Sequence, residues 1–232
     1  MFLLCGLFGS LPLWGLSAKP LDLDTIFTDE NPEALFDRLA ADPFATFGPE
    51  EWSHPFRSVD FYRAVPACTE AMKQHPDEAR FKLGAAIAFI AGQKNAEATK
   101  LLEPLIAEGN SSAMLALALI SPEAESAGLM RKAADVGNPN AMMLYGMSLM
   151  TGKGVSKDSI AGVRMIRRAA EAGSTCAMLL LANFYNHGTY GVGLNPEAGK
   201  KLIDKAASLG DPAAKEMLAS LAQGKAGSSE PQ

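Results

Sequence analysis

A glycine-rich turn in the second half of the chain is the first candidate for chemistry. Gly152, Lys153 and Gly154 stand together in the segment MTGKGVSKDSI. Such a turn before a helix can bind phosphate, because the backbone N–H groups at a helix N-terminus attract anions. A nucleotide-binding loop, however, needs Gly-x4-Gly-Lys-Ser/Thr after a strand, and a dinucleotide-binding turn needs a third glycine. The segment has neither pattern, which favours a turn that serves the fold.

The other residue types that catalyse reactions show no recognisable arrangement. The sequence has no Gly-x-Ser-x-Gly elbow, and its histidines, His54, His75 and His187, are far apart in the chain. The paired acids Glu50 and Glu51 stand in a loop flanked by Pro and Gly, which favours solvated side chains over catalytic ones. We therefore expect no catalytic, cofactor-binding or metal-binding residue and no enzyme. The alternative is an envelope or secreted hydrolase-like protein with a site near His187.

Composition and charge limit the class of protein. The 232 residues carry a net charge of -5, which excludes a strongly basic nucleic-acid binder. The aromatic share is only 7%, and Ala, Leu, Gly and Met dominate the second half, which favours helices over strands. Residues 19–60 contain ten acidic and three basic residues. This acidic stretch indicates a solvated segment or, alternatively, a dock for a basic partner.

The N-terminus has the composition of an export signal. Residues 1–18 contain no charged side chain and end in small residues, so we expect a signal peptide cleaved after Ser17 or Ala18. A buried strand and a membrane anchor are the alternatives. Export predicts a periplasmic or secreted protein. Residues 19–58 then form an acidic segment and cap. The aromatic residues of FGPEEWSHPFRSVDFY are expected to cover the first repeat; they are Phe47, Trp52, Phe56, Phe61 and Tyr62.

Internal repeats organise the rest of the chain. The segments MRKAADVGNPNAM, IRRAAEAGSTCAM and IDKAASLGDPAAK share the order basic–Ala–Ala–x–x–Gly, with glycines at 137, 173 and 210. Each unit predicts two helices joined by a turn, and one such unit cannot bury its own apolar face. We therefore expect an all-α, right-handed α-solenoid of stacked helix–turn–helix repeats over residues 59–221, followed by a disordered tail at 222–232.

Local signals place the helix ends within a unit. Gly152 and Gly188 are expected to end the first helices, and Asp158 and Asn195 to cap the second ones. The unit beginning at Ala113 has no glycine turn and repeats after only 28 residues. It is therefore expected to have a shortened loop or first helix near residues 121–122.

The order Ala-x-x-x-Leu-Gly-x-x-Tyr-x-x-Gly-x-Gly-Val-x-x-Asp, followed by Ala-Ala-x-x-Gly, resembles the Sel1-like repeat (SLR), a relative of the tetratricopeptide repeat. The resemblance is strong over residues 138–210 and weaker back to about residue 60. Tyr145 and Leu149 depart from the pattern. The resemblance implies an adaptor or regulator of the bacterial envelope that binds a protein partner. We also expect a monomer that binds neither nucleic acid nor a small-molecule substrate. A secreted, host-directed binding protein is an alternative.

The candidate partner-binding residues are methionines and polar side chains of the first helices. Methionines follow the frame alanines at equivalent positions, which predicts core packing or, alternatively, an adaptable concave surface that binds a peptide. Polar residues of one repeat are expected to line the same surface. The candidates are Met114, Met142, Met143, Met178, Asn183, Asn186, His187 and Tyr190.

Two further groups of residues are expected to be structural. Cys68 and Cys176 stand about a hundred residues apart and are interpreted as buried thiols. Basic residues concentrate on the second helices, where we interpret them as a solvated convex face. They are Arg131, Lys132, Arg167, Arg168, Lys200, Lys201 and Lys205.

Overall fold

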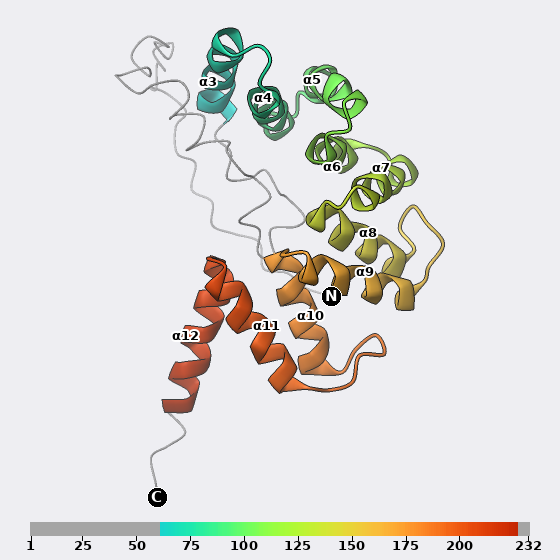
Figure 1. Ribbon diagram of the computed structural model, residues 1–232, viewed down its shortest axis with the longest axis vertical. Helices are drawn as coiled ribbons and strands as arrows, with labels where there is room; N and C mark the ends of the chain where they lie inside the picture. Colours follow the sequence, from blue (N-terminus) through green and yellow to red (C-terminus); the bar gives the residue numbers. More distant parts are fainter. Residues whose placement is uncertain (1–60, 227–232) are drawn as a thin grey trace, which may run out of the picture. The chain divides into compact units, whose positions relative to one another are not determined.

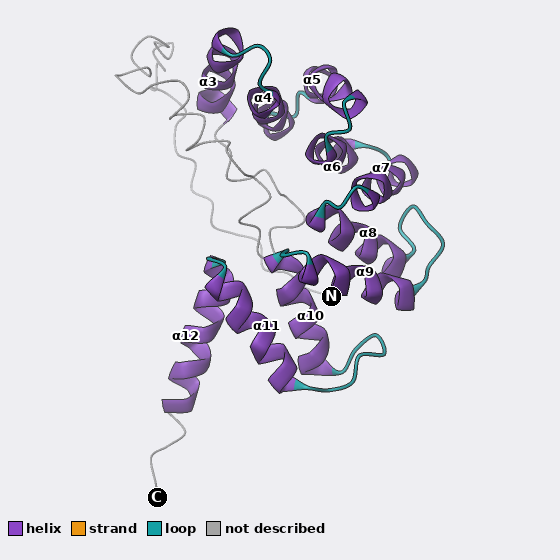
Figure 2. Ribbon diagram, viewed as in Figure 1, coloured by secondary structure: helices purple, strands orange, loops and turns teal. Residues whose placement is uncertain are grey.

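The computed structural model describes residues 61–226, which belong to one structural unit of the chain. The predictions for residues 1–60 and 227–232 lie outside this range. They include the signal peptide and the aromatic cap, except for Phe61 and Tyr62, with which the described range begins. Within it all the regular secondary structure is helical, and no strand is present (Figure 2). The helices are α3 Phe61–Gln74, α4 Ala79–Ala91, α5 Asn95–Ala107, α6 Ser111–Ile120, α7 Glu123–Asp135, α8 Pro139–Thr151, α9 Ser159–Glu171, α10 Thr175–His187, α11 Pro196–Ser208 and α12 Pro212–Ala226.

The helices follow one another in chain order, and each packs against the next one (Figure 1). Contacts also join α4 to α6 and α8 to α10. These contacts join alternate helices of the stack. We therefore assign α4, α6, α8 and α10 as the first helices of successive units, and α5, α7, α9 and α11 as the second helices. The prediction of an all-α solenoid of helical repeats is confirmed.

Side-chain caps begin the helices of the best-defined repeats. Asp158 Oδ1 accepts a hydrogen bond from the N–H of Ala161 at 2.8 Å, and Asn195 Oδ1 accepts one from Ala198 at 3.0 Å. Each cap satisfies a backbone N–H that the first turn of a helix leaves without a partner. The two N-caps predicted from the sequence are therefore confirmed.

The predicted turn glycines end the first helices. Gly152 follows α8 with φ of 81°, and Gly188 follows α10 with φ of 62°. Both residues are in the left-handed region, which costs a residue with a Cβ roughly 1–2 kcal/mol. The glycines of MTGKGVSKDSI thus set the direction of the backbone between two helices.

The short repeat has both a shorter first helix and a shorter loop than the other repeats. Helix α6 has 10 residues, whereas α8 and α10 have 13 each. Only Ser121 and Pro122 separate α6 from α7. Pro122 starts the next helix with φ of -56°, which suits the ring-fixed φ of proline.

The C-terminal boundary differs from the expected one. Helix α12 continues to Ala226, so residues 222–226 are helical and do not belong to the predicted tail. The segment AQGKA contains two Ala residues, Gln and Lys, all of which favour helix, and this outweighs the cost of one glycine.

The core consists largely of alanine, methionine and branched aliphatic side chains. One cluster extends over the first and second helices from α6 to α12 and includes the fully buried Leu115, Ile166 and Met178. Smaller clusters join α4 to α6 and α3 to α4. Small residues on facing helices allow close approach, and this positions the surface side chains described below.

Candidate functional site

The four candidate methionines lie in the core. Exposed fractions are 0% for Met178, 3% for Met143, 6% for Met142 and 8% for Met114. Their burial favours the packing interpretation, because a partner cannot reach side chains so well covered. Another methionine of the same repeat, Met147, is only partly buried and packs at the edge of the core.

The polar candidates lie on the last turns of α10 and in the loop after it. Asn183, Asn186 and His187 are exposed. The Nδ1 atom of His187 lies 2.9 Å from the carbonyl oxygen of Asn183, to which a protonated Nδ1 donates. The side-chain oxygen of Asn186 lies where a Cβ on Gly199 would be placed, so Asn186 faces α11. The polar candidates therefore do not form one groove with the buried methionines.

Tyr190 lies apart from this group, in the α10–α11 loop. Its side chain is 54% exposed, and its ring centroid lies 4.9 Å from that of Phe184. The backbone φ of Tyr190 is 54°, which is uncommon for a residue other than glycine. The ring therefore covers the end of α10 from a strained turn.

A more accessible row of side chains follows from helical spacing. Leu144 and Met147 on α8, with Leu180, Asn183 and His187 on α10, recur every three or four residues and are half-buried or exposed. Because α8 contacts α10, these residues form a continuous face of the first helices, which we call the first-helix face.

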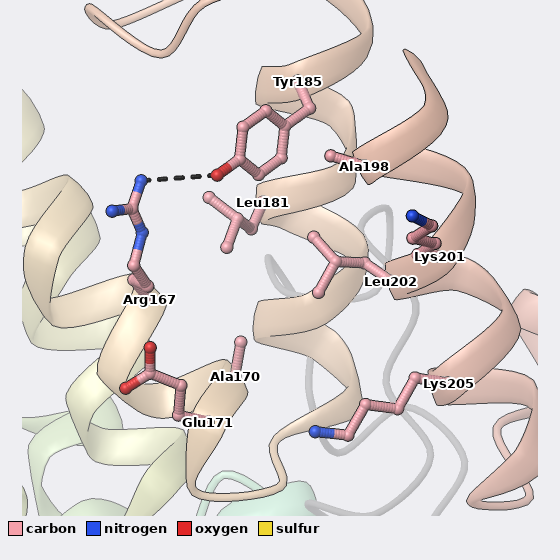
Figure 3. A pocket seen from close by; sticks show the side chains of 9 residues that line it. All are labelled: Arg167, Ala170, Glu171, Leu181, Tyr185, Ala198, Lys201, Leu202 and Lys205. Carbon is pink, nitrogen blue, oxygen red and sulfur yellow. Dashed lines mark hydrogen bonds between the residues drawn. The ribbon is translucent and has the colours of Figure 1, made fainter. Parts of the chain in front are cut away.

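The described chain also has a groove between two consecutive repeats. Its volume is about 320 Å³, and α9, α10 and α11 line it. Leu181 and Tyr185 of α10 lie at the back, between Arg167 and Glu171 of α9 on one side and the side chains of α11 on the other (Figure 3). We call this site the basic groove. Its lining is Arg167, Ala170, Glu171, Leu181, Tyr185, Ala198, Lys201, Leu202 and Lys205.

The basic groove combines an apolar floor with a cationic rim. Leu202 and Tyr185 are half-buried, whereas Arg167, Lys201 and Lys205 are exposed. An Nη2 atom of Arg167 lies 3.5 Å from the hydroxyl oxygen of Tyr185 (dashed line in Figure 3). Neither Lys201 nor Lys205 forms an ion pair with another residue that the structure describes. The rim thus offers charges for a ligand.

The sequence analysis missed this site because it assigned these bases to a solvated convex face. Lys200 fits that assignment, since its Nζ lies 2.7 Å from Asp204 Oδ2 on the same helix. Lys201 and Lys205 instead border an apolar slot. The signal that could have found them is their position beside half-buried apolar residues at helical spacing.

The described residues contain no group of three or more His, Cys, Asp or Glu side chains arranged to hold a metal ion. Within residues 61–226, none of the helices combines the length and apolar character needed to span a bilayer.

Comparison with known proteins identifies the two best-defined units. The Sel1 repeat model matches residues 139–174 and 177–211, which correspond to α8–α9 and α10–α11. No curated protein matches the chain. Solved structures that share its fold at low sequence identity include two Sel1-like repeat proteins.

The first is a Sel1 repeat protein from Oxalobacter formigenes, with a TM-score of 0.56, 19% identity and 64% of this chain covered. The second is c5321, a protective antigen of uropathogenic Escherichia coli with an SLR fold, with a TM-score of 0.51, 20% identity and 83% of this chain covered. The chain spans 63% and 44% of the lengths of these proteins.

Proposed function

We propose that this chain, which is a Sel1-like repeat protein, acts in the bacterial envelope as an adaptor or regulator that binds a protein partner. Sel1 repeat proteins are protein-interaction modules, and this supports the general class of function. The uncharged, apolar residues 1–18 support the proposed placement in the periplasm or outside the cell.

One structural observation carries the proposal. Stacking of the repeats buries the frame alanines and methionines, yet it leaves two surfaces on which half-buried apolar residues stand beside exposed polar ones. These are the first-helix face and the basic groove. Protein interfaces typically have this composition, with an apolar centre and a polar rim. A partner that covers either surface would bury side chains that the stack alone leaves in contact with water.

The first-helix face takes the place of the methionine surface expected from the sequence. Met147 and Leu180 supply its apolar part, and Asn183 and His187 its polar part. A partner peptide or helix lying across α8 and α10 would contact all four residues.

Cross-linked affinity capture tests the proposal. Tagged full-length protein is expressed in the cells that produce it, cross-linked and purified, and co-purifying proteins are quantified by mass spectrometry. We expect at least one envelope protein to be enriched over an unrelated tagged envelope protein. No enriched protein in repeated captures would contradict the interaction function.

Two variants then assign the surface. Asn183→Trp adds bulk to the first-helix face, and the pair Arg167→Glu with Lys201→Glu reverses the rim of the basic groove. Loss of the captured protein with one variant and retention with the other identifies the surface used. If both variants retain it, neither surface is the binding site.

The Sel1 repeat family is generally a non-catalytic scaffold, and we propose the same for this chain. The hydrolase alternative would place a site at His187. Envelope substrate turnover by the purified protein that disappears in His187→Ala would overturn the non-enzymatic proposal. A host-directed role would instead require that the captured partner come from the host.

A further inference from the structure

We propose that the second-helix side of the two Sel1 repeats is a two-slot docking site for an acidic peptide segment with large apolar side chains. The inference rests on the proposed interaction function and names the chemistry of one partner. Its first slot is defined by sequence and structure together, and its second slot is the basic groove.

The repeat frame places a second set of residues in the same relation as those of the basic groove. Counting back 36 residues from Arg167, Glu171, Leu181 and Tyr185 gives Arg131, Asp135, Tyr145 and Leu149. Counting back 37 residues from Lys201, Leu202 and Lys205, past the longer loop, gives Arg164, Met165 and Arg168. Each of these residues lies on the helix that precedes its counterpart by one repeat: α7, α8 and α9.

The equivalent residues have similar exposure, although Tyr145 is half-buried where Leu181 is buried. Tyr145, Leu149 and Met165 are half-buried, and Arg131, Arg164 and Arg168 are exposed. Helices α7, α8 and α9 pack together as α9, α10 and α11 do. By this equivalence the first slot would have an apolar floor, three basic residues and one acid, as the basic groove has.

Helix α9 supplies bases to both slots. Arg167 lines the basic groove, whereas Arg164 and Arg168 occupy the frame positions of Lys201 and Lys205, which border the preceding slot. The two slots are therefore adjacent along the stack, one repeat apart. A single extended segment running across α7, α9 and α11 can contact both.

The pattern stops at the boundary of the matched repeats. Counting back a further 28 residues from Arg131, by the short period of that unit, reaches Glu103, and counting back 36 from Arg164 reaches Gly128. Of the three bases of the first slot, only Arg168 has a basic counterpart upstream, Lys132, so the upstream unit lacks the full arrangement of bases. A basic rim that recurs only where two slots are adjacent differs from the scattered charge of a solvated surface.

Charge complementarity identifies the occupant. Six bases surround the two slots against two acids, Asp135 and Glu171, in a protein of net charge -5. Carboxylates of a partner would pair with the bases, and the apolar floors would each accept one large side chain. A nucleic acid fits less well, since its phosphates would gain nothing from the apolar floors and would face the two carboxylates.

Peptide selection followed by a charge-reversal series tests the inference. A phage-displayed library of random twelve-residue peptides is selected on the immobilised full-length protein, and enriched peptides are synthesised with a fluorescein label. Binding is measured by fluorescence anisotropy. We expect enriched peptides to carry Asp or Glu on both sides of Leu, Ile, Phe, Met or Trp, and binding to weaken severalfold between 50 and 300 mM NaCl.

The variant pair Arg167→Glu with Lys201→Glu is expected to raise the dissociation constant at least tenfold, and Arg131→Glu with Arg164→Glu to do the same. Lys215→Glu, an exposed reversal on α12, is the matched control and is expected to change it less than twofold. Leu202→Ala tests the apolar floor and is expected to weaken binding severalfold. Circular dichroism of each variant checks that the helices remain folded.

Several outcomes would overturn the inference. These are failure to enrich any peptide, enrichment without acidic residues, equal binding by the groove variants and the control, or tighter binding of a fluorescein-labelled oligothymidine than of the selected peptides. A partner captured from cells that both groove variants retain would leave the interaction function standing and remove only this docking site. Failure of capture as well would remove both.

Discussion

Gly146 of α8 and Gly162 of α9 face each other where the two helices cross. A Cβ atom on Gly146 would lie 2.8 Å from the carbonyl oxygen of Gly162, and one on Gly162 would lie 2.6 Å from that of Gly146. Real Cβ atoms essentially never approach other atoms below 3.0 Å. The pair therefore allows the two helices of one repeat to pack backbone against backbone.

Gly162→Ala is expected to destabilise the protein although alanine favours helix. Relief of the helix-propensity cost would add about 1 kcal/mol, but forcing the helices apart costs roughly 1–3 kcal/mol and displaces Met150. We expect a net loss of up to about 2 kcal/mol in the free energy of unfolding, measured by urea denaturation.

Gly128→Ala is the matched control. Gly128 lies in the interior of α7, and a Cβ there would meet no atom within 4 Å. We expect a gain of about 0.5–1 kcal/mol, because only the propensity effect operates. Equal changes in the two variants would show that the Gly146–Gly162 crossing is looser than described.

Ser174→Ala is expected to lower the stability of the junction between the two Sel1 repeats. The Ser174 hydroxyl accepts a hydrogen bond from the N–H of Ala177 and donates one, 3.0 Å long, to Asn140 Oδ1 of the preceding repeat. Loss of a buried cap and a cross-repeat bond costs about 1–2 kcal/mol. Ser156→Ala, in the exposed α8–α9 loop, should change the free energy of unfolding by less than about 0.5 kcal/mol. Indistinguishable urea midpoints for the two variants would rule out this role.

Local features of the fold could be predicted from the sequence because they depend on neighbours in the chain. Asp158 caps the helix that begins at the next residue, and Gly152 adopts the left-handed conformation that ends α8. The shortened unit near Ser121 could be predicted from the repeat period alone. Helix ends that lack a capping residue or a turn glycine were harder to predict from the sequence. The end of α12 at Ala226 therefore differs from the expected boundary.

The accessible surface could be predicted only in part, because burial depends on how neighbouring helices pack. Met142 and Met147 lie five residues apart on α8, which places them on different sides of the helix. Sequence periodicity did not distinguish which side contacts the next repeat. The basic groove depends in addition on the approach of α9 to α11, which no local pattern specifies.

Residues 1–18 are expected to direct export. A fusion of residues 1–20 to alkaline phosphatase lacking its own signal should be active, because that enzyme needs the oxidising periplasm to form its disulfides. Changing Leu3 and Leu4 to Asp, which breaks the apolar run, should abolish activity. Phosphatase activity no higher for the intact fusion than for the Asp variant would contradict export.

Cys68 is expected to make the stability of the protein fall at high pH. Cys68 is a free thiol in the core between α3 and α4, and burial raises its pKa from 9.0 to about 12. Between these values the thiol ionises in the unfolded chain but stays protonated in the folded one, so unfolding becomes more favourable as pH rises. Ionisation of Cys68 changes the free energy of unfolding by at most about 1.4 kcal/mol per pH unit. Urea denaturation of the natural protein and of Cys68→Ala from pH 8 to pH 10.5 isolates it, because other groups titrate alike in both. Above pH 9 the free energy of unfolding of the natural protein should fall relative to that of Cys68→Ala. A constant difference between the two proteins from pH 8 to pH 10.5 would show that the thiol is accessible to solvent.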